Sequence, residues 1–280
     1  MLEPTQDPFT ETHQDHLLAI DALNVARRVY EANPAPDSAE KAKSAVRAIR
    51  LSLIRALNEH APTHLLVALD AGGPTWRHAL NADYKKNRKP MPEELRTELE
   101  MLWQDLRNKG WAIARVPGVE ADDALASAAR LAQAAGLRCT VLSTDKDMLY
   151  LLSYGARVYD HFGRLERNVE WCHHKLGIEP VQVLDWLALM GDATDSIAGI
   201  DKVGKKTAAK MLKMFGTLDK VLEQAQRGAV PGVLGKRLCE QAHVARAARQ
   251  LTELRTDCFA NGLPWPKLTR FSKDIAPAPL

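Results

Sequence analysis

The sequence contains few cysteines that could form disulfides or bind zinc. It holds four cysteines in 280 residues, at Cys139, Cys172, Cys239 and Cys258, and no two of them form a C-x-x-C pair. Such wide spacing argues against a zinc site and against a disulfide framework. We therefore expect reduced thiols, each acting as a small hydrophobic residue, as in a reducing cytoplasm.

Long apolar runs are also missing. No stretch approaches the roughly 18 uninterrupted apolar residues that a membrane helix needs. The first 15 residues lack the basic start and the apolar centre of a secretion signal. These absences predict a cytoplasmic protein without a membrane partner, in which residues 1–15 form a disordered arm.

An excess of one charge is the third absence. The chain carries 38 Lys and Arg against 35 Asp and Glu, a net charge of +3, which by itself says little about partners. With 46% hydrophobic residues, the chain can bury one sizeable core plus a smaller satellite domain. The positions of the charges are therefore more informative than their sum.

Short apolar runs alternate with longer helical patterns over the first 170 residues. The runs of strand length are Leu17–Ile20, Leu65–Leu69 and Cys139–Leu142, with a weaker one at Trp111–Val116. The helical patterns are Ala45–Leu57, Pro92–Lys109 and Asp122–Ala135. This alternation predicts an α/β sandwich around a mainly parallel sheet. Two further segments, Ala156–Asp160 and Arg164–Val169, predict a hairpin at the edge of that sheet.

The pattern changes after Trp171, where strands cease. Short helices are predicted at Pro180–Met190, Lys206–Phe215, Leu218–Gln226 and Val233–Leu251. This change predicts a domain boundary near residues 170–178 and a small all-α second domain. The proline-bearing residues 259–280 are expected to form a tail on the surface.

Acidic residues follow nearly every predicted strand. Asp21, Asp70 and Asp145 each end a strand, and the other members of the set are Glu120, Asp122, Asp123, Asp147, Asp192 and Asp195. For any single aspartate, a helix cap or a turn is the better explanation. However, the carboxyl ends of parallel strands meet at one edge, so the repeated pattern predicts converging carboxylates. Oxygen ligands without His or Cys select Mg²⁺ or Mn²⁺.

A basic segment follows the second acidic strand, with four cations within residues 85–89. Its cations, including Lys85, Lys86 and Arg88, are suited to binding substrate phosphates beside an acidic metal site. Tyr84 and Trp76 lie close in sequence and are candidates for stacking on a base. The alternative is a solvated basic loop, which a charge run alone usually is.

Residues 197–212 predict two helices joined by a tight hairpin. Gly199 and Gly204 permit the turn, and amides at the start of the following helix can bind a phosphate. The surrounding cations are Lys202, Lys205, Lys206 and Lys210. Such a hairpin grips duplex backbone without reading its sequence. An ordinary corner between two helices is the alternative.

Taken together, these motifs resemble the bacterial 5′-nuclease (flap endonuclease) family. The motifs that match, in order, are Asp21, Asp70, Glu120–Asp123, Ser143–Asp147, Gly191–Asp195 and the hairpin. The resemblance covers residues 16–255. The family includes stand-alone exonuclease IX-type enzymes and the N-terminal domain of DNA polymerase I. It implies a PIN-like three-layer α/β/α nuclease domain over 16–174, with a basic arch at 71–96. It also implies a helix–hairpin–helix domain of the H3TH type over 175–258.

The resemblance implies a role for each matching residue. Asp21, Asp70, Glu120, Asp122 and Asp123 would hold a first Mg²⁺ directly or through water. Asp145 and Asp147 would lie between two metals, and Asp192 and Asp195 would serve the second. Lys85, with Arg88, would supply positive charge in the transition state, and Arg28 would steer a phosphate. A K⁺ ion would be held by the carbonyls of Leu189, Met190, Ala198, Ile200 and Val203. The DNA contacts would be Tyr84, Lys86, Lys202, Gly204, Lys205, Lys206, Thr207 and Lys210.

The implied activity is two-metal-ion hydrolysis of phosphodiester bonds in 5′-flapped, branched or nicked DNA. The expected protein is a monomer associated with a bacterial nucleoid and active in DNA replication or repair. Ala198, Lys202 and Lys205 depart from the Pro, Gly and Pro that are usual in the family's hairpin. Two rival interpretations are a DNA-binding scaffold without catalysis and an RNA-directed PIN-type ribonuclease. A fragment of DNA polymerase I is a third.

Overall fold

A computed structural model describes residues 15–263 and 269–270. The predicted disordered arm, apart from Asp15, and most of the predicted tail lie outside these residues. Within them, no helix has the length and apolar character needed to cross a membrane.

The predicted sheet is confirmed. Its strands lie in the order β3-β2-β1-β4-β5-β6, and all pairs from β3 to β5 are parallel. The strand bounds are β1 (His16–Asp21), β2 (His64–Leu69), β3 (Ile113–Arg115), β4 (Arg138–Leu142), β5 (Arg157–Asp160), β6 (Leu165–Glu166) and β7 (Thr269–Arg270). Antiparallel β7 pairs with the beginning of β2, so the chain returns to the sheet late in its sequence.

The predicted edge hairpin is present as antiparallel β5 and β6. Its second strand ends at Glu166, three residues before the predicted end at Val169. The reason is local, because the Asn168 side chain accepts a hydrogen bond from the Trp171 amide and starts helix α6 (Val169–Lys175).

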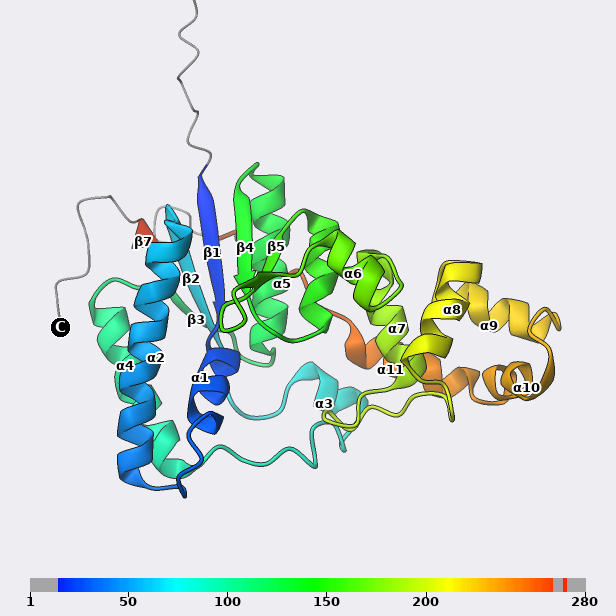
Figure 1. The fold of residues 1–280 in the computed structure, drawn as a ribbon, viewed down its shortest axis with the longest axis horizontal. Coiled ribbons are helices and arrows are strands. Elements are labelled where there is room, and N and C mark those ends of the chain that lie inside the picture. Colours follow the sequence, from blue (N-terminus) through cyan, green and yellow to red (C-terminus); the bar gives the residue numbers. More distant parts are fainter. Residues whose placement is uncertain (1–14, 264–268, 271–280) are drawn as a thin grey trace, which may run out of the picture.

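Helices cover both faces of the sheet (Figure 1). Residues of β1 and β2 alternate between the faces, so that Leu18 and Ile20 lie in one core and Leu17 and Ala19 lie in the other. The first core is closed by α1 (Ala22–Glu31), α2 (Ala39–His60) and α4 (Glu93–Asn108). The second is closed by α5 (Ala121–Ala134) and the 3₁₀ helix η1 (Asp147–Tyr154). The expected three-layer α/β/α arrangement is therefore confirmed.

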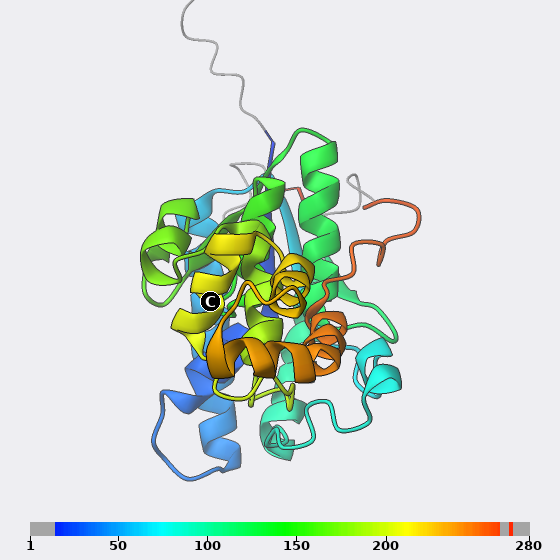
Figure 2. The same ribbon diagram turned by 90° about the vertical axis from the view of Figure 1, so that its right-hand side faces the viewer.

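The helical part of the chain continues the second core. It contains η2 (Pro180–Gln182), α7 (Val183–Met190), α8 (Lys205–Phe215), α9 (Leu218–Gln226), α10 (Gly232–Glu240) and α11 (Ala242–Thr252). Trp186 of α7 is fully buried, and its indole N–H donates to the Lys205 carbonyl. Figure 2 views the molecule from the side of these helices, which lie in front of the sheet. Apolar packing thus joins the two parts of the chain.

The single helix predicted over Val233–Leu251 is wrong, since α10 and α11 are separate. They are divided at Gln241, whose backbone leaves the helical conformation. Its side chain accepts a hydrogen bond from the Asp201 amide at 2.8 Å and donates to the Asp201 carboxylate at 3.1 Å. This contact across 40 residues favours the break, and the local sequence gives no sign of it.

The hairpin also differs from its prediction. Residues 197–204 contain no helix, and the first helix of the motif is α7, which ends at Met190. Gly191 and Gly199 let two backbone segments touch, because a Cβ added at Gly199 would lie 2.2 Å from the Met190 carbonyl carbon. At Gly204 a Cβ would meet nothing within 4 Å, so the fold itself does not require that glycine.

We therefore expect Gly199→Ala to lower the free energy of unfolding by about 2 to 3 kcal/mol, since the added methyl group overlaps backbone that cannot move easily. Gly204→Ala is the matched control and should change it by less than about 1 kcal/mol. Urea unfolding of the two variants measures both effects. Equal stabilities would show that residues 191 and 199 are not in close contact.

Candidate active site

Three carboxylates from three elements meet at the carboxyl edge of the sheet. Asp21 ends β1, Asp145 follows β4, and Asp122 lies in the first turn of α5. Strands β1 and β4 are neighbours that pair up to Ile20 and Leu142, and the chain order of the strands reverses between them. Carboxylate oxygens of Asp21, Asp122 and Asp145 all lie within 4.8 Å of one another. The predicted convergence is therefore present for these residues.

The cluster is strained electrostatically. Burial and the neighbouring Asp145 raise the pKa of Asp21 from 3.8 to about 7. Burial and the same neighbour raise the pKa of Asp147 to about 7. Burial and repulsion from Asp147 and Asp21 raise the pKa of Asp122 well above its ordinary value. Without a counter-ion, the folded chain retains protons here in a pH range where free aspartates are ionised.

The donor chemistry fits a divalent cation. The three clustered residues offer oxygen ligands only, and hard ions such as Mg²⁺ and Mn²⁺ prefer oxygen. A cation of this kind would also relieve the repulsion that raises the pKa values of Asp21 and Asp122. The residues present therefore fit the predicted metal site.

The remaining predicted acids of the sheet edge and the 191–195 loop surround the cluster. Asp70 follows β2 and accepts a hydrogen bond from the Ala121 amide at 2.8 Å, next to Asp122. It lines a cavity of about 330 Å³ together with Asp21, Asp122 and Asp145. A neighbouring cavity of about 190 Å³ is lined by Asp122, Asp145, Asp147, Asp192 and Asp195. The two cavities share Asp122 and Asp145, so eight of the nine predicted acids, all except Asp123, line one continuous region.

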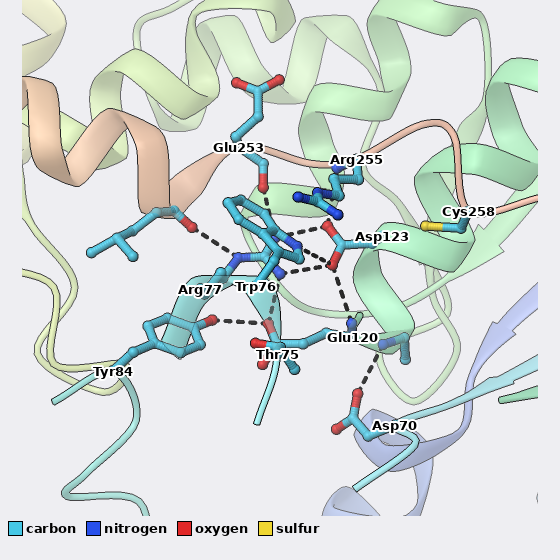
Figure 3. Close-up of polar contacts among 12 residues, drawn as sticks. Asp70, Thr75, Trp76, Arg77, Tyr84, Glu120, Asp123, Glu253, Arg255 and Cys258 are labelled. Carbon is cyan, nitrogen blue, oxygen red and sulfur yellow. Dashed lines mark hydrogen bonds and ion pairs between the residues drawn. The ribbon is translucent and has the colours of Figure 1, made fainter. Parts of the chain in front are cut away.

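Glu120 is engaged by cations in this structure. Its Oε1 accepts from Lys85 Nζ at 2.6 Å, and its Oε2 accepts from Arg77 at 3.0 Å and from the Tyr84 hydroxyl at 2.9 Å. Figure 3 shows Arg77 and Tyr84 pointing toward this carboxylate. Glu120 lines the smaller cavity but is outside the three-residue cluster, so it lies at the border of the site.

The placement of Asp123 contradicts its predicted role as a metal ligand. Asp123 is fully buried, and both of its oxygens are bound by the Arg77 guanidinium at 2.8 and 2.9 Å. It also accepts hydrogen bonds from the Trp76 indole and from the Glu120 and Arg255 amides (Figure 3). One residue further along the helix than Asp122, its side chain points about 100° away around the axis, toward the protein interior.

The prediction that Tyr84 contacts DNA is also contradicted by its position in the structure. Only 4% of it is exposed, and its hydroxyl donates to Glu120. Trp76 is also unsuited to base stacking, because its ring already lies between the guanidinium groups of Arg77 and Arg255, at 4.4 and 4.7 Å. The two aromatic side chains therefore hold the acidic residues Asp123 and Glu120 in place.

Lys85 enters the site with a left-handed backbone. Its φ is +57°, an uncommon value for a residue with a side chain, and its amide donates to the Asp195 carbonyl at 2.9 Å. Burial lowers the pKa of Lys85, but Glu120, Asp122 and Asp195 together raise it above the ordinary value. Lys85 is thus held as a cation that faces both cavities.

Three arginines line the larger cavity together with Lys85. One of them, Arg27, is not among the predicted site residues. Arg88 lines both cavities, and Arg28 lines the larger one while its guanidinium lies 5.4 Å from the Phe162 ring centre. Arg27 lines it as well, and the buried Nε atoms of Arg27 and Arg88 have no hydrogen-bond partner in the part of the chain that the structure describes. The sequence signal that could have indicated Arg27 is helical spacing, since Leu23, Asn24, Arg27 and Arg28 lie on one face of α1.

The cations of the hairpin lie apart from the acidic cluster. Lys202, Lys205, Lys206 and Lys210 are exposed at and after the loop that precedes α8, and Gly204 caps that helix. Lys86 is exposed as well, and Thr207 is half-buried. Of the predicted potassium ligands, the carbonyls of Leu189 and Ile200 each accept a backbone hydrogen bond. Met190 ends α7, and Ala198 and Val203 lie in the loop between α7 and α8. Potassium binding stays a prediction.

Known proteins are similar to this chain in sequence and in fold. Models of two consecutive domains match: the N-terminal resolvase-like domain of 5′-3′ exonuclease over residues 16–177, and its C-terminal SAM-fold domain over 178–269. Flap endonuclease Xni of Shewanella loihica (strain ATCC BAA-1088 / PV-4) is 35% identical over 256 residues, covering 88% of this chain and 94% of that protein.

Two solved structures have the same fold. The T5 5′-exonuclease with bound divalent metal ions (zinc) has a TM-score of 0.69 and 21% identity, covering 87% of this chain and 91% of that one. The bacteriophage T5 flap endonuclease, as a pseudo-enzyme–product complex with DNA and metal ions, has a TM-score of 0.69 and 22% identity, covering 87% and 90%.

The repulsion within the cluster predicts a stabilising substitution. An aspartate whose pKa is raised by folding destabilises the folded state progressively as pH rises from its unfolded value of 3.8. Asp122→Asn removes this penalty, so at pH 8 in EDTA we expect a gain on the order of 1 kcal/mol in the free energy of unfolding.

The control is the same comparison at pH 4, where the gain should largely vanish because the wild-type carboxyl group is protonated in the folded state. Thermal unfolding at both pH values measures it. A variant that is less stable than the wild type at pH 8 would contradict the electrostatic account.

Proposed function

This chain belongs to the 5′-3′ exonuclease family, and from that premise we propose that it is a structure-specific 5′-nuclease. It hydrolyses phosphodiester bonds in flapped, branched or nicked DNA, with Mg²⁺ as its working cation and Mn²⁺ as a substitute. DNA replication or repair is the setting that such substrates suggest.

One observation carries the proposal: Asp21, Asp122 and Asp145 converge within 4.8 Å beside a group of cations. Acidic clusters that have no basic side chains beside them bind metal ions in many kinds of protein. Basic side chains alone bind phosphates. The combination suits a reaction in which a phosphodiester must be held next to divalent ions.

Asp21, Asp122 and Asp145 would hold the divalent cations, with Asp70 and Asp147 adjacent and Asp195 on the facing loop. When bound, the cations supply an activated water and stabilise the charge that develops on the phosphate oxygens. Lys85 and Arg88 contact the phosphate from the opposite wall of the cavities, and their charge offsets the charge of the transition state.

Arg27 and Arg28 extend this cationic wall along α1. The buried Nε of Arg27 has no partner among residues 15–263, and a phosphate oxygen of the substrate strand would supply one. The exposed cations before and within α8 are suited to the backbone of a duplex at a distance from the scissile bond. We also propose K⁺ at the 189–203 hairpin, where it would reinforce that grip, and a monomeric enzyme.

Asp145→Asn tests the catalytic assignment. Asp145 is exposed and has no ion-pair partner among the described residues, so the fold should survive the change. We expect cleavage of a 5′-labelled DNA flap in Mg²⁺ to fall by at least about a thousandfold. Binding of the same flap, measured by fluorescence anisotropy in Ca²⁺, should be retained.

Asp219→Asn is the matched control, because Asp219 is a surface residue at the start of α9. It should cut at the wild-type rate. Undiminished cleavage by Asp145→Asn, together with a wild type that is active, would remove Asp145 from the metal site.

Lys85→Ala separates chemistry from binding. Loss of a half-buried cation that faces the scissile region should slow single-turnover cleavage at saturating flap by about 10²- to 10³-fold, with a change in Kd of less than about threefold. Lys86→Ala, at the exposed neighbouring position, should weaken binding modestly without slowing the saturated rate. If Lys85→Ala changes only Kd, Lys85 acts as a phosphate tether.

A further inference from the structure

Arg77 lies at a junction that the catalytic proposal does not use. It is 3% exposed, and all five N–H groups of its guanidinium are satisfied by protein oxygens. Two of these donate to Asp123, at 2.8 and 2.9 Å, and one donates to Glu120, at 3.0 Å. The other two donate to the carbonyls of Leu251 and Glu253, at 2.9 and 2.6 Å.

Arg77 and its partners belong to three segments that are far apart in sequence. Arg77 itself belongs to α3 (Trp76–Leu80), within the segment that leads to Lys85. Glu120 and Asp123 flank the start of α5, where Asp122 faces the metal site. Leu251 and Glu253 lie at the end of α11, the last helix of the DNA-gripping part. One side chain thus joins the segment that leads to Lys85, helix α5 and the helical part (Figure 3).

Asp123 strengthens the same junction from the other side. Its Oδ1 accepts the Arg255 amide at 3.0 Å, so the chain leaving α11 is bound to α5. Ser127, one turn further along α5, donates to the Arg255 carbonyl and accepts from the Cys258 amide. Residues 251–258 are therefore fixed to the helix that carries Asp122.

The position of this junction has a consequence for a nuclease. The exposed cations that suit duplex DNA lie on and before α8, which packs against α7, and α7 packs against α11. The carboxylates lie at the sheet edge and at the start of α5. The distance from the gripped duplex to the cutting site therefore depends on how α11 is held against α5.

We propose that Arg77 and Asp123 form a positioning pair that sets which phosphodiester bond is cut. The inference rests on the proposed nuclease function and on DNA binding by the helical part. The pair touches no reacting atoms; it holds the DNA-gripping helices and Glu120 in one register with the metal-binding carboxylates. Loosening it lets the duplex settle at more than one distance from the carboxylates.

Arg77→Lys is the appropriate change. A lysine keeps a positive charge beside Asp123, so no buried carboxylate is left without a counter-charge. Its single ammonium carries three donors on a flexible stem and cannot reproduce the planar fork that reaches two carboxylates and two carbonyls at once. The variant thus keeps the positive charge but loses most of the hydrogen bonds that join the three segments.

The experiment is cleavage of a 5′-labelled DNA flap in Mg²⁺, with products sized at single-nucleotide resolution under single-turnover conditions. For the wild type we expect one dominant product. For Arg77→Lys we expect products spread over neighbouring bonds and a rate about ten- to hundredfold lower, with flap affinity unchanged.

Arg249→Lys is the matched control. Arg249 is also an ion-paired arginine on α11, but its carboxylate partners, Asp185 and Glu253, both lie in the helical part. It should leave the product distribution as in the wild type.

A purely structural role for Arg77 would lower the active fraction of Arg77→Lys and leave the product sizes unchanged, and that result would overturn the proposal. An inactive wild type would instead contradict the nuclease function itself. If Arg77→Lys does not fold, Asp123→Asn, which loosens the same pair while keeping its shape, is judged by the same product distribution.

Discussion

The dominant constraint on this molecule is the repulsion among carboxylates gathered at one edge of a parallel sheet. Asp21, Asp122 and Asp145 lie close together, and burial with the neighbouring carboxylates, Asp147 included, raises the pKa values of Asp21 and Asp122. No fold places such groups together without compensation. Here the compensation comes from cations on the surrounding wall and from the site's fitness for divalent ions. The arrangement of the neighbouring segments follows from this requirement.

The basic segment shows how that compensation is built. Lys85 faces the cavities because Glu120 binds its ammonium and because Asp195 binds its amide in a left-handed backbone. Glu120 is in turn held by Arg77 and by the Tyr84 hydroxyl. The position of the Lys85 ammonium therefore depends on a buried network that reaches back to α5 and α11. Such networks are rigid when every polar group is satisfied, as the guanidinium of Arg77 is.

Much of the fold follows from local pattern. The apolar runs at β1, β2 and β4 predict a parallel sheet, because strands buried on both faces are continuously apolar. Asp21, Asp70 and Asp145 predict the site edge, because each follows a strand and parallel strands end together. The glycine at 199 is likewise evident in the sequence, although its reason, contact with Met190, is not.

Other features depend on contacts that no local pattern contains. The break between α10 and α11 depends on the pairing of Gln241 with Asp201, and the buried position of Tyr84 depends on Glu120. Asp122 and Asp123 are adjacent and chemically identical, and both satisfy a motif. The sequence by itself determined which residue types reach the sheet edge. Only the tertiary structure decided that Asp122 faces the carboxylates of Asp21 and Asp145 and that Asp123 faces Arg77, because successive helical residues point about 100° apart and only packing fixes the direction of each.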